Sequence, residues 1–262
     1  MKAMIALVLA SAALIGLSTV NTRAETLTLG NEGTYPPFSM IEADGALKGL
    51  EPELAQAMCQ RMEVDCEIQA MDFNALLPSL VSGKIDLIAS QLWPTPERLE
   101  KAEFTEPVLF NPNAFIVPKT WDKGYAPEAM SGLRVAVIQG SSQAKFLGEN
   151  YPDLTLVPYD NPDQMQLDLL AGRVDAAFGA KLNWIITLID TPEGADWMVS
   201  DEDFWDTGEP VGLSWAAQKG NSELVGRVNE ALAGLLEDCT YTTIRTKYFS
   251  QPTSPREPES CL

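Results

Sequence analysis

The 262-residue chain contains no histidine and only four cysteines, and these two shortages restrict the chemistry it can carry. Without an imidazole, the sequence lacks the usual general base and every Ser-His or Cys-His nucleophilic arrangement. A structural zinc site is also disfavoured, because the cysteines show no paired C-x-x-C spacing and no histidine completes a ligand set. We therefore expect no metal, no other cofactor and no enzymatic activity.

Basic residues are scarce as well. The chain has 18 lysines and arginines against 37 aspartates and glutamates, for a formal net charge of −19 at pH 7. The phosphate backbone of a nucleic acid would be repelled, so DNA and RNA are excluded as partners. The acidic surface favours solubility and can attract cationic solutes, but it does not identify a ligand.

Long apolar runs are absent except at the start of the chain. Lys2 precedes the apolar run Ala3–Leu17, which is too short for a typical membrane span. Thr22-Arg23-Ala24 resembles a small-x-small cleavage site, so residues 1–24 are predicted to be a signal peptide. The mature chain is then expected to begin at Glu25, in the periplasm of a Gram-negative cell. Four cysteines in an exported chain are typical of two disulfides.

The rest of the chain contains two similar series of alternating strands and helices. The first series comprises strands at 26–30, 66–70 and 85–89 and helices at 51–62 and 73–82. The second comprises strands at 134–138, 154–158 and 174–178 and helices at 142–150 and 162–171. Extended segments at 108–118 and 211–217 and helices at 222–237 and 241–249 complete the prediction. Strands separated by helices imply parallel sheets, so we predict an α/β protein with two lobes.

Residues 86–106 are the stretch most informative about function. A buried strand is expected to end before Ser90 and Gln91, and two prolines come after them. Thr95 before Pro96 is typical of an N-cap with proline at the first helical position, which places Arg98 in the first turn of a short helix. Ligands of open α/β sheets bind at such strand ends, and an arginine can fork two hydrogen bonds to a carboxylate. The alternative is a surface ion pair of Arg98 with neighbouring glutamates.

The segment Thr95-Pro96-Glu97-Arg98, followed by Phe104-Thr105, resembles the signature of periplasmic solute-binding proteins for polar amino acids. The likeness is greatest to the lysine/arginine/ornithine-, histidine- and opine-binding group. Further matching segments, in order, are Gly33–Phe38, Gly49–Ala55, Leu77–Leu80, Val137–Gln143 and Leu170–Phe178. Together they span nearly all of the mature chain. The set is specific to the fold and the broad family, and less specific to the ligand.

The resemblance implies a two-lobed periplasmic binding protein fold, in which each lobe is a mainly parallel sheet flanked by helices. The chain would cross between the lobes twice, near 109–113 and 207–213. Residues 25–110 and 210–262 would form lobe 1, and residues 111–209 lobe 2. Solute would bind in the cleft, and the lobes would close around it by hinge motion. The expected partners are an amino acid or derivative and the membrane permease of an ABC importer, with a monomer as the family's usual state.

The resemblance also indicates how the cysteines pair. The binding-protein group has a disulfide close to the position of Cys59 and Cys66. Cys239 and Cys261 would then form the second disulfide and tie the C-terminal tail back onto the last helix.

The same family implies a set of ligand contacts. Arg98 would take the ligand carboxylate, Ser90 and Gln91 would offer polar groups, and Ser142 would donate from the other lobe, with Gln143 beside it. A helix N-terminus favours anions, which supports the role of Ser142, although Ser142 can instead be a plain N-cap.

Aromatic and acidic side chains would form the rest of the site. Tyr35 and Phe73 occupy positions where the family places walls around the solute side chain, and aromatic faces suit cationic or planar groups. Phe73 can also simply pack at the start of its helix. Glu32 corresponds to an acidic position that meets the distal cation in binders of basic amino acids. The alternative is an ordinary exposed surface glutamate.

Two positions depart from the family pattern. Binders of free amino acids usually carry an aspartate that pairs with the α-ammonium, and Ala180 stands at that position. Since an unpaired ammonium in a closed cleft is costly, an opine-type ligand with a substituted amine is favoured. Trp93 replaces a small hydroxyl residue and either narrows the pocket or packs behind the loop.

The sequence thus predicts a periplasmic substrate-binding component of an ABC importer. The ligand would be an amino acid or derivative, opine-like or cationic, held without any chemical step. The alternative is a periplasmic cyclohexadienyl-type dehydratase on the same fold, for which Glu32 is the candidate acid or base.

Overall fold

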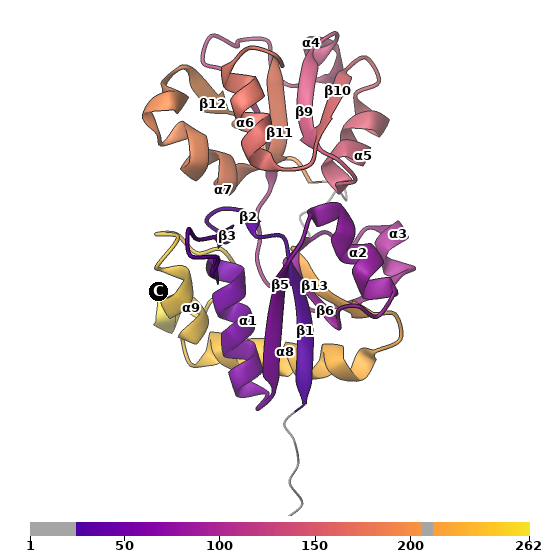
Figure 1. Ribbon diagram of the computed structural model, residues 1–262. Coiled ribbons are helices and arrows are strands. Elements are labelled where there is room, and N and C mark those ends of the chain that lie inside the picture. Colours follow the sequence, from indigo (N-terminus) through magenta and orange to yellow (C-terminus); the bar gives the residue numbers. More distant parts are fainter. Residues whose placement is uncertain (1–24, 206–211) are drawn as a thin grey trace, which may run out of the picture.

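The computed structural model describes residues 25–205 and 212–262, which fold into two α/β units stacked on one another (Figure 1). We call the unit that contains the N-terminal strand the first lobe and the other the second lobe. The predicted signal peptide, residues 1–24, lies outside the described residues. So does most of the second predicted crossing between lobes, at 207–213.

The first lobe is built on a five-stranded sheet of order β5-β1-β6-β13-β7. Strands β1, β5 and β6 are parallel, and β13 runs antiparallel to β6 and β7. The strands are β1 (Thr26–Asn31), β5 (Asp65–Ala70), β6 (Leu87–Leu92), β7 (Ala102–Phe104) and β13 (Ser214–Gln218). The helices are α1 (Leu50–Arg61), α2 (Phe73–Val81), α3 (Pro96–Leu99), α8 (Ser222–Glu237) and α9 (Thr240–Arg245).

A small antiparallel sheet accompanies this lobe on the side that faces the second one (Figure 1). Its strands are β2 (Thr34–Tyr35), β3 (Ser39–Ile41) and β4 (Leu47–Lys48), and a short 3-10 helix, Glu259–Cys261, lies near the C-terminus.

The second lobe carries a five-stranded sheet of order β10-β9-β11-β8-β12. Strands β9, β10 and β11 are parallel, and β8 is antiparallel to β11 and β12. The strands are β8 (Asn113–Pro118), β9 (Arg134–Ile138), β10 (Thr155–Tyr159), β11 (Ala176–Ala180) and β12 (Trp197–Val199). The helices are α4 (Pro127–Met130), α5 (Ser142–Asn150), α6 (Pro162–Leu170), α7 (Lys181–Trp184), a π-helical turn Ile185–Ile189 and a 3-10 turn Pro192–Asp196.

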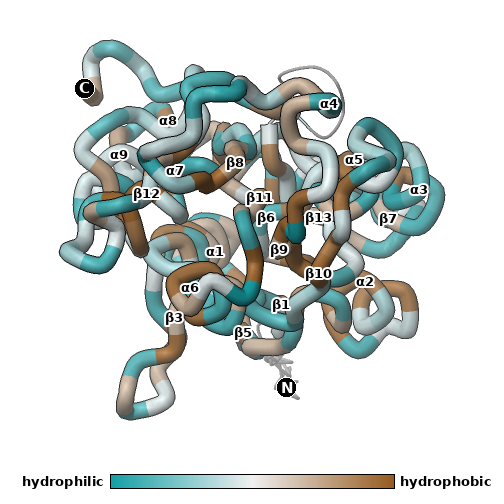
Figure 2. Tube along the Cα trace, turned by 90° about the horizontal axis from the view of Figure 1, so that it is seen from above, coloured by the Kyte–Doolittle hydropathy of each residue, from teal (hydrophilic) through white to brown (hydrophobic). Residues whose placement is uncertain are grey.

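Both large sheets are covered on their two faces, as parallel sheets require. In the first lobe, Leu29 packs with α1 and α8 on one face, while Ile88 packs with α2 on the other. The second lobe repeats this with one cluster around Phe115 and another around Ile116, consecutive residues of β8 that point to opposite faces. In Figure 2 the hydrophobic segments gather on central strands such as β8 and β9, with hydrophilic loops around them.

The fold class predicted from the sequence is confirmed, and most of its elements form close to their expected bounds. Helices α5 and α8 span the predicted residues. The long extended segment predicted at 108–118 is wrong in extent, because regular pairing in β8 begins only at Asn113. Pro107 and Pro112 flank the irregular part of that segment and cannot donate ladder hydrogen bonds. The residues 181–200, for which no element was predicted, hold α7, two short helical turns and β12.

Both disulfides are formed. Cys59–Cys66 joins the end of α1 to β5, and Cys239–Cys261 joins the residue before α9 to the C-terminal tail. In the described part of the chain, no helix is both long and apolar enough to cross a membrane.

The C-terminal tail also contacts the segment that leads from β7 to β8. The Phe110 N–H donates to the Thr253 carbonyl oxygen at 2.7 Å, and Arg256 Nη1 donates to the Pro107 carbonyl oxygen at 3.0 Å. The tail therefore supports the first passage of the chain between the lobes.

Candidate functional site

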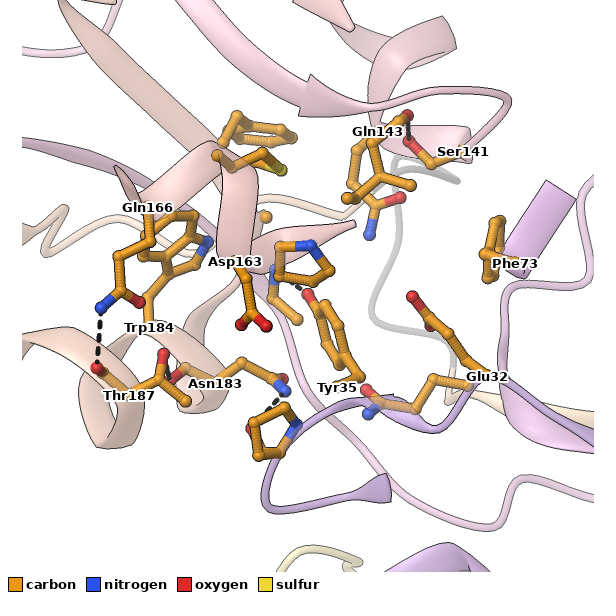
Figure 3. Close-up of a pocket in the computed structure, with 18 of the residues that line it drawn as sticks. Glu32, Tyr35, Phe73, Ser141, Gln143, Asp163, Gln166, Asn183, Trp184 and Thr187 are labelled. Carbon is orange, nitrogen blue, oxygen red and sulfur yellow. Dashed lines mark hydrogen bonds between the residues drawn. The ribbon is translucent and has the colours of Figure 1, made fainter. Parts of the chain in front are cut away.

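A cavity of about 190 Å³ lies between the two lobes. Figure 3 shows Glu32 and Tyr35 from the first lobe, and Asp163 and Asn183 from the second, around the same space. The cavity lies where loops and helix starts come after the carboxyl ends of the parallel strands, such as β1, β6 and β11. This is the usual ligand position in open α/β sheets.

Seven of the ten residues predicted from the sequence line this cavity: Glu32, Tyr35, Phe73, Gln91, Trp93, Gln143 and Ala180. The other three, Ser90, Arg98 and Ser142, are buried close by in the chain but are not among the lining residues. Whether any of the ten contacts a ligand stays a prediction.

Arg98 lies in the first turn of α3, as expected, with Pro96 at the start of the helix. Its Nη1 donates to the Trp93 carbonyl oxygen at 3.1 Å, and its guanidinium carbon lies 5.6 Å from the centre of the Phe73 ring. The surface position considered as the alternative is wrong, because Arg98 is only 8% exposed. The guanidinium therefore contacts two residues that line the cavity, Phe73 and Trp93.

Two local predictions around the serines are wrong. Strand β6 does not end before Ser90 but continues to Leu92, so Ser90 and Gln91 are strand residues. The N-cap of α5 is Ser141 rather than Ser142, because Ser141 Oγ accepts the Ala144 N–H at 3.1 Å. Ser141 lines the cavity, while Ser142 is buried in the first turn of α5.

The aromatic side chains form walls on the side of the first lobe. The Tyr35 hydroxyl accepts the Ala180 N–H at 3.4 Å, so this ring reaches the second lobe. Phe73 opens α2 and lines the cavity. Trp93 lines the cavity and also packs edge-on against Trp205, with 5.7 Å between ring centres. That it narrows the pocket for the ligand stays a prediction.

Glu32 is a buried acid in the cavity wall. Only 7% of it is exposed, so the alternative of an ordinary surface glutamate is wrong. Burial raises the pKa of Glu32 to about 7, the Thr34 hydroxyl that donates to it at 3.3 Å opposes this, and the negative charge of Asp72 adds to it. Burial also raises the pKa of Glu51, and the charge of Glu32 raises it further. A cation beside Glu32 would favour its charged form.

Ala180 closes β11 and is buried beside the cavity. Its methyl group leaves no carboxylate at that position. The neighbouring Lys181 points elsewhere and pairs with Asp203 at 2.7 Å. Asp163, in the first turn of α6, lines the same cavity from the second lobe.

The sequence did not identify several polar residues that line the cavity: Ser141, Asp163, Gln166, Asn183 and Thr187. Asn183 comes shortly after the end of β11, and the strand-end rule could have indicated it. Nothing in the local pattern marks Gln166, whose position depends on how α6 packs against the turn that contains Thr187.

The two lobes also contact each other directly. Asn183 Nδ2 of α7 donates to the Pro36 carbonyl oxygen at 3.1 Å, and Lys145 of α5 pairs with Glu97 of α3. The described residues include no group of three or more acidic or cysteine side chains placed to hold a metal ion. The arrangement can therefore offer a small solute between the lobes hydrogen bonds, aromatic faces and two acidic side chains.

Comparison with known proteins gives a consistent result. The model of the bacterial extracellular solute-binding proteins, family 3, matches residues 27–251. The lysine/arginine/ornithine-binding periplasmic protein of Escherichia coli (strain K12) is 34% identical over 253 residues, which cover 92% of this chain and 96% of that protein.

Solved structures extend the likeness to three dimensions. An ancestral arginine-binding protein bound to arginine has a TM-score of 0.78 and 32% identity, over 86% of this chain and 98% of that chain. An ancestral amino acid-binding protein described as a precursor of cyclohexadienyl dehydratase has a TM-score of 0.75 and 26% identity, over 86% and 96% of the two chains.

Proposed function

Because this chain belongs to family 3 of the bacterial extracellular solute-binding proteins, we propose that it captures an amino acid or amino-acid derivative for an ABC transporter. The family and the two-lobed fold inferred from the sequence motifs are confirmed. The family supports the substrate-binding role, and the residues of the cavity wall support the choice of ligand.

The ligand carries a cationic group, and the charge of the cavity wall is the observation that supports this. Among the described residues that line the cavity, Glu32 and Asp163 are acidic and no lysine or arginine is present. A buried carboxylate is costly unless it is paired, so a ligand cation near Glu32 offsets the cost. We propose that Arg98, which contacts the Phe73 ring and the Trp93 carbonyl oxygen, meets a carboxylate at the other end of the ligand.

The amine of the ligand is the point at which an opine and a free amino acid differ. A primary α-ammonium needs an acceptor, and Ala180 supplies none from its side chain. In an opine the amine bears a carboxyalkyl substituent, so it has fewer N–H donors that need an acceptor at position 180. We therefore propose an opine-like or cationic amino-acid derivative as the solute.

Retention without turnover is the direct test of this function. The mature protein is incubated with an opine and a cationic amino acid, separated from free solute, and analysed by mass spectrometry. We expect about one equivalent of solute per protein, chemically unchanged. The incubation uses solute concentrations far above a Kd of about 1 μM. If the protein retains none of the tested solutes after separation, the proposal is contradicted.

A dehydratase acting on a cyclohexadienyl carboxylate is the second candidate, and one observation favours it. Glu32 is a buried acid in the cavity, with its pKa raised to about 7 by burial, as a general acid or base near neutral pH would be. Incubation with prephenate and spectroscopic detection of an aromatic product decides between the two. We expect no turnover. Turnover by the wild type that is lost in Glu32→Gln would establish the enzyme.

Glu32 makes both stability and binding depend on pH. Its pKa is raised from 4.5 to about 7 in the folded protein, so the fold favours the neutral acid. Stability from this group is fully present below pH 4.5 and is lost as the pH rises through 7, by about 3 kcal/mol in total. A cationic ligand needs the charged form, so its affinity is expected to rise over the same interval.

Urea unfolding of the ligand-free protein at pH 5 and pH 8 measures this effect, with Glu32→Gln as the control. The wild type should lose stability between these pH values relative to the variant, which does not titrate at this position. Parallel pH profiles for the two proteins would show that Glu32 is not the group responsible.

The remaining features of the function are also proposals. We propose that export removes residues 1–24 and that the mature protein binds its solute as a monomer in the periplasm and delivers it to a membrane permease. We further propose lobe boundaries at 25–110 with 210–262, and at 111–209. The family description as extracellular solute-binding proteins supports export and solute binding. The grouping of β8 to β12 in one sheet supports the lobe boundaries.

A further inference from the structure

Three side-chain amides form a hydrogen-bonded row between the lobes. Asn111, fully buried in the segment that leads from the first lobe to the second, donates from Nδ2 to Gln91 Oε1 at 3.2 Å. The same Nδ2 donates to Asn183 Oδ1 at 3.0 Å. We call Gln91, Asn111 and Asn183 the amide relay. Its two ends, Gln91 and Asn183, line the cavity, whereas Asn111 does not.

Backbone groups fix the orientation of the two asparagines of the relay, Asn111 and Asn183. The Leu182 N–H donates to Asn111 Oδ1 at 3.0 Å, and Asn183 Nδ2 donates to the Pro36 carbonyl oxygen at 3.1 Å. A backbone N–H can only donate and a carbonyl oxygen can only accept. Asn111 must therefore turn its oxygen to Leu182 and its Nδ2 to Gln91.

This orientation of Asn111 determines which atom of the Gln91 amide has no hydrogen-bond partner within the relay. Since its Oε1 accepts from Asn111, its Nε2 is the atom left over, and in the described structure Nε2 is buried without a hydrogen-bond partner. A buried donor without an acceptor destabilises the folded state. Gln91 lines the cavity, and a ligand bound there would lie next to this side chain.

We propose that the amide relay holds Gln91 as an obligate hydrogen-bond donor and so selects ligands that place a carboxylate oxygen against it. The inference rests on the proposed function and narrows its ligand to a molecule with a carboxylate at Gln91 as well as a cation at Glu32. Leu182 and Asn183 belong to the second lobe and Gln91 and Pro36 to the first. The orientation is therefore fixed only when the lobes are in contact.

Gln91→Glu is the first test. The new side chain still offers an oxygen to Asn111, but it replaces the Nε2 donor with a second, negatively charged oxygen. The matched control is Gln166→Glu, which makes the same change in the same cavity. Gln166 Nε2 donates to the Thr187 carbonyl oxygen at 3.2 Å and is not part of the relay.

The probes are arginine, its N-carboxyethyl derivative (an opine) and agmatine, which is arginine without its carboxylate. Calorimetric titrations of the mature protein compare them at one pH. Gln91→Glu should weaken binding of the carboxylated probe that the wild type prefers by about tenfold or more relative to Gln166→Glu. Binding of agmatine should not be weakened. Equal losses in the two variants, or an equal loss for agmatine, would overturn the inference.

Asn111→Asp tests the relay itself from outside the cavity. An aspartate can still accept the Leu182 N–H but cannot donate to Gln91, so Gln91 must rotate and present its oxygen to the ligand. The ratio of affinities for the carboxylated probe and agmatine should fall about tenfold. An unchanged ratio in the folded variant overturns the relay. A wild type that binds none of the three probes overturns the proposed function as well, whereas binding that Gln91→Glu leaves intact overturns the inference alone.

Discussion

Arg98→Ala is expected to weaken ligand binding by several kcal/mol, which corresponds to a rise in Kd of about two to three orders of magnitude. The guanidinium is buried in the first turn of α3, with the Trp93 carbonyl oxygen and the Phe73 ring fixing its position. Without it, the carboxylate of a bound solute would be enclosed with no opposite charge. Isothermal titration with the solute retained by the wild type measures the loss.

Two variants make this result specific. Arg173→Ala removes an exposed arginine of the second lobe that pairs with Asp168, and it should leave Kd unchanged. Arg98→Lys keeps the charge but not the two-pronged geometry, and its loss should be smaller than that of Arg98→Ala. If Arg98→Ala binds as tightly as Arg173→Ala, Arg98 is not the carboxylate partner.

Glu257→Ala is expected to destabilise the fold by about 3–5 kcal/mol. Its buried carboxylate pairs with Arg245 at 2.9 Å and accepts the Thr242 hydroxyl at 2.9 Å. It also accepts the Thr253 N–H at 2.9 Å and so shapes the tail. Truncation would leave the Arg245 guanidinium buried without its counter-charge. The free energy of unfolding from urea denaturation measures the effect.

Glu149→Ala is the control for this stability prediction. Glu149 is well exposed and lies 3.8 Å from Lys145 on the surface of α5, so its removal should change stability by less than about 1 kcal/mol. Similar stability losses in the two variants would show that the buried Arg245–Glu257 pair contributes no more stability than a surface ion pair. Because the Thr253 carbonyl group supports Phe110 between the lobes, Glu257→Ala should also weaken solute binding.

The framework of the fold was predictable because each lobe repeats a strong local pattern. Helix α8 buries Leu224, Val228, Ala231, Leu232 and Leu235, which recur at helical spacing in the sequence. The region 181–200 lacks such a pattern, and its short turns are held by contacts with distant strands, as β12 is by β8. Local periodicity carries no signal for elements of this kind.

The site was predictable to the extent that motif residues keep their place at strand ends. The motifs indicated Tyr35, Glu32 and Gln143, which line the cavity. They could not indicate Asn111 or its two partners in the amide relay as a connected row. That row depends on residues from β6, α7 and the connecting segment, and these meet only in the folded chain.

The most direct test of the central claim is thermal melting of the mature protein against opines, cationic and neutral amino acids, and carboxylates that lack an amine. A ligand that binds only the folded state raises the melting temperature to an extent set by its affinity and concentration. We predict a saturable shift with an opine or a cationic amino acid, reduced in Arg98→Ala. If no compound in the panel shifts the melting temperature, or if the shift persists in Arg98→Ala, capture of such a solute at this site is contradicted.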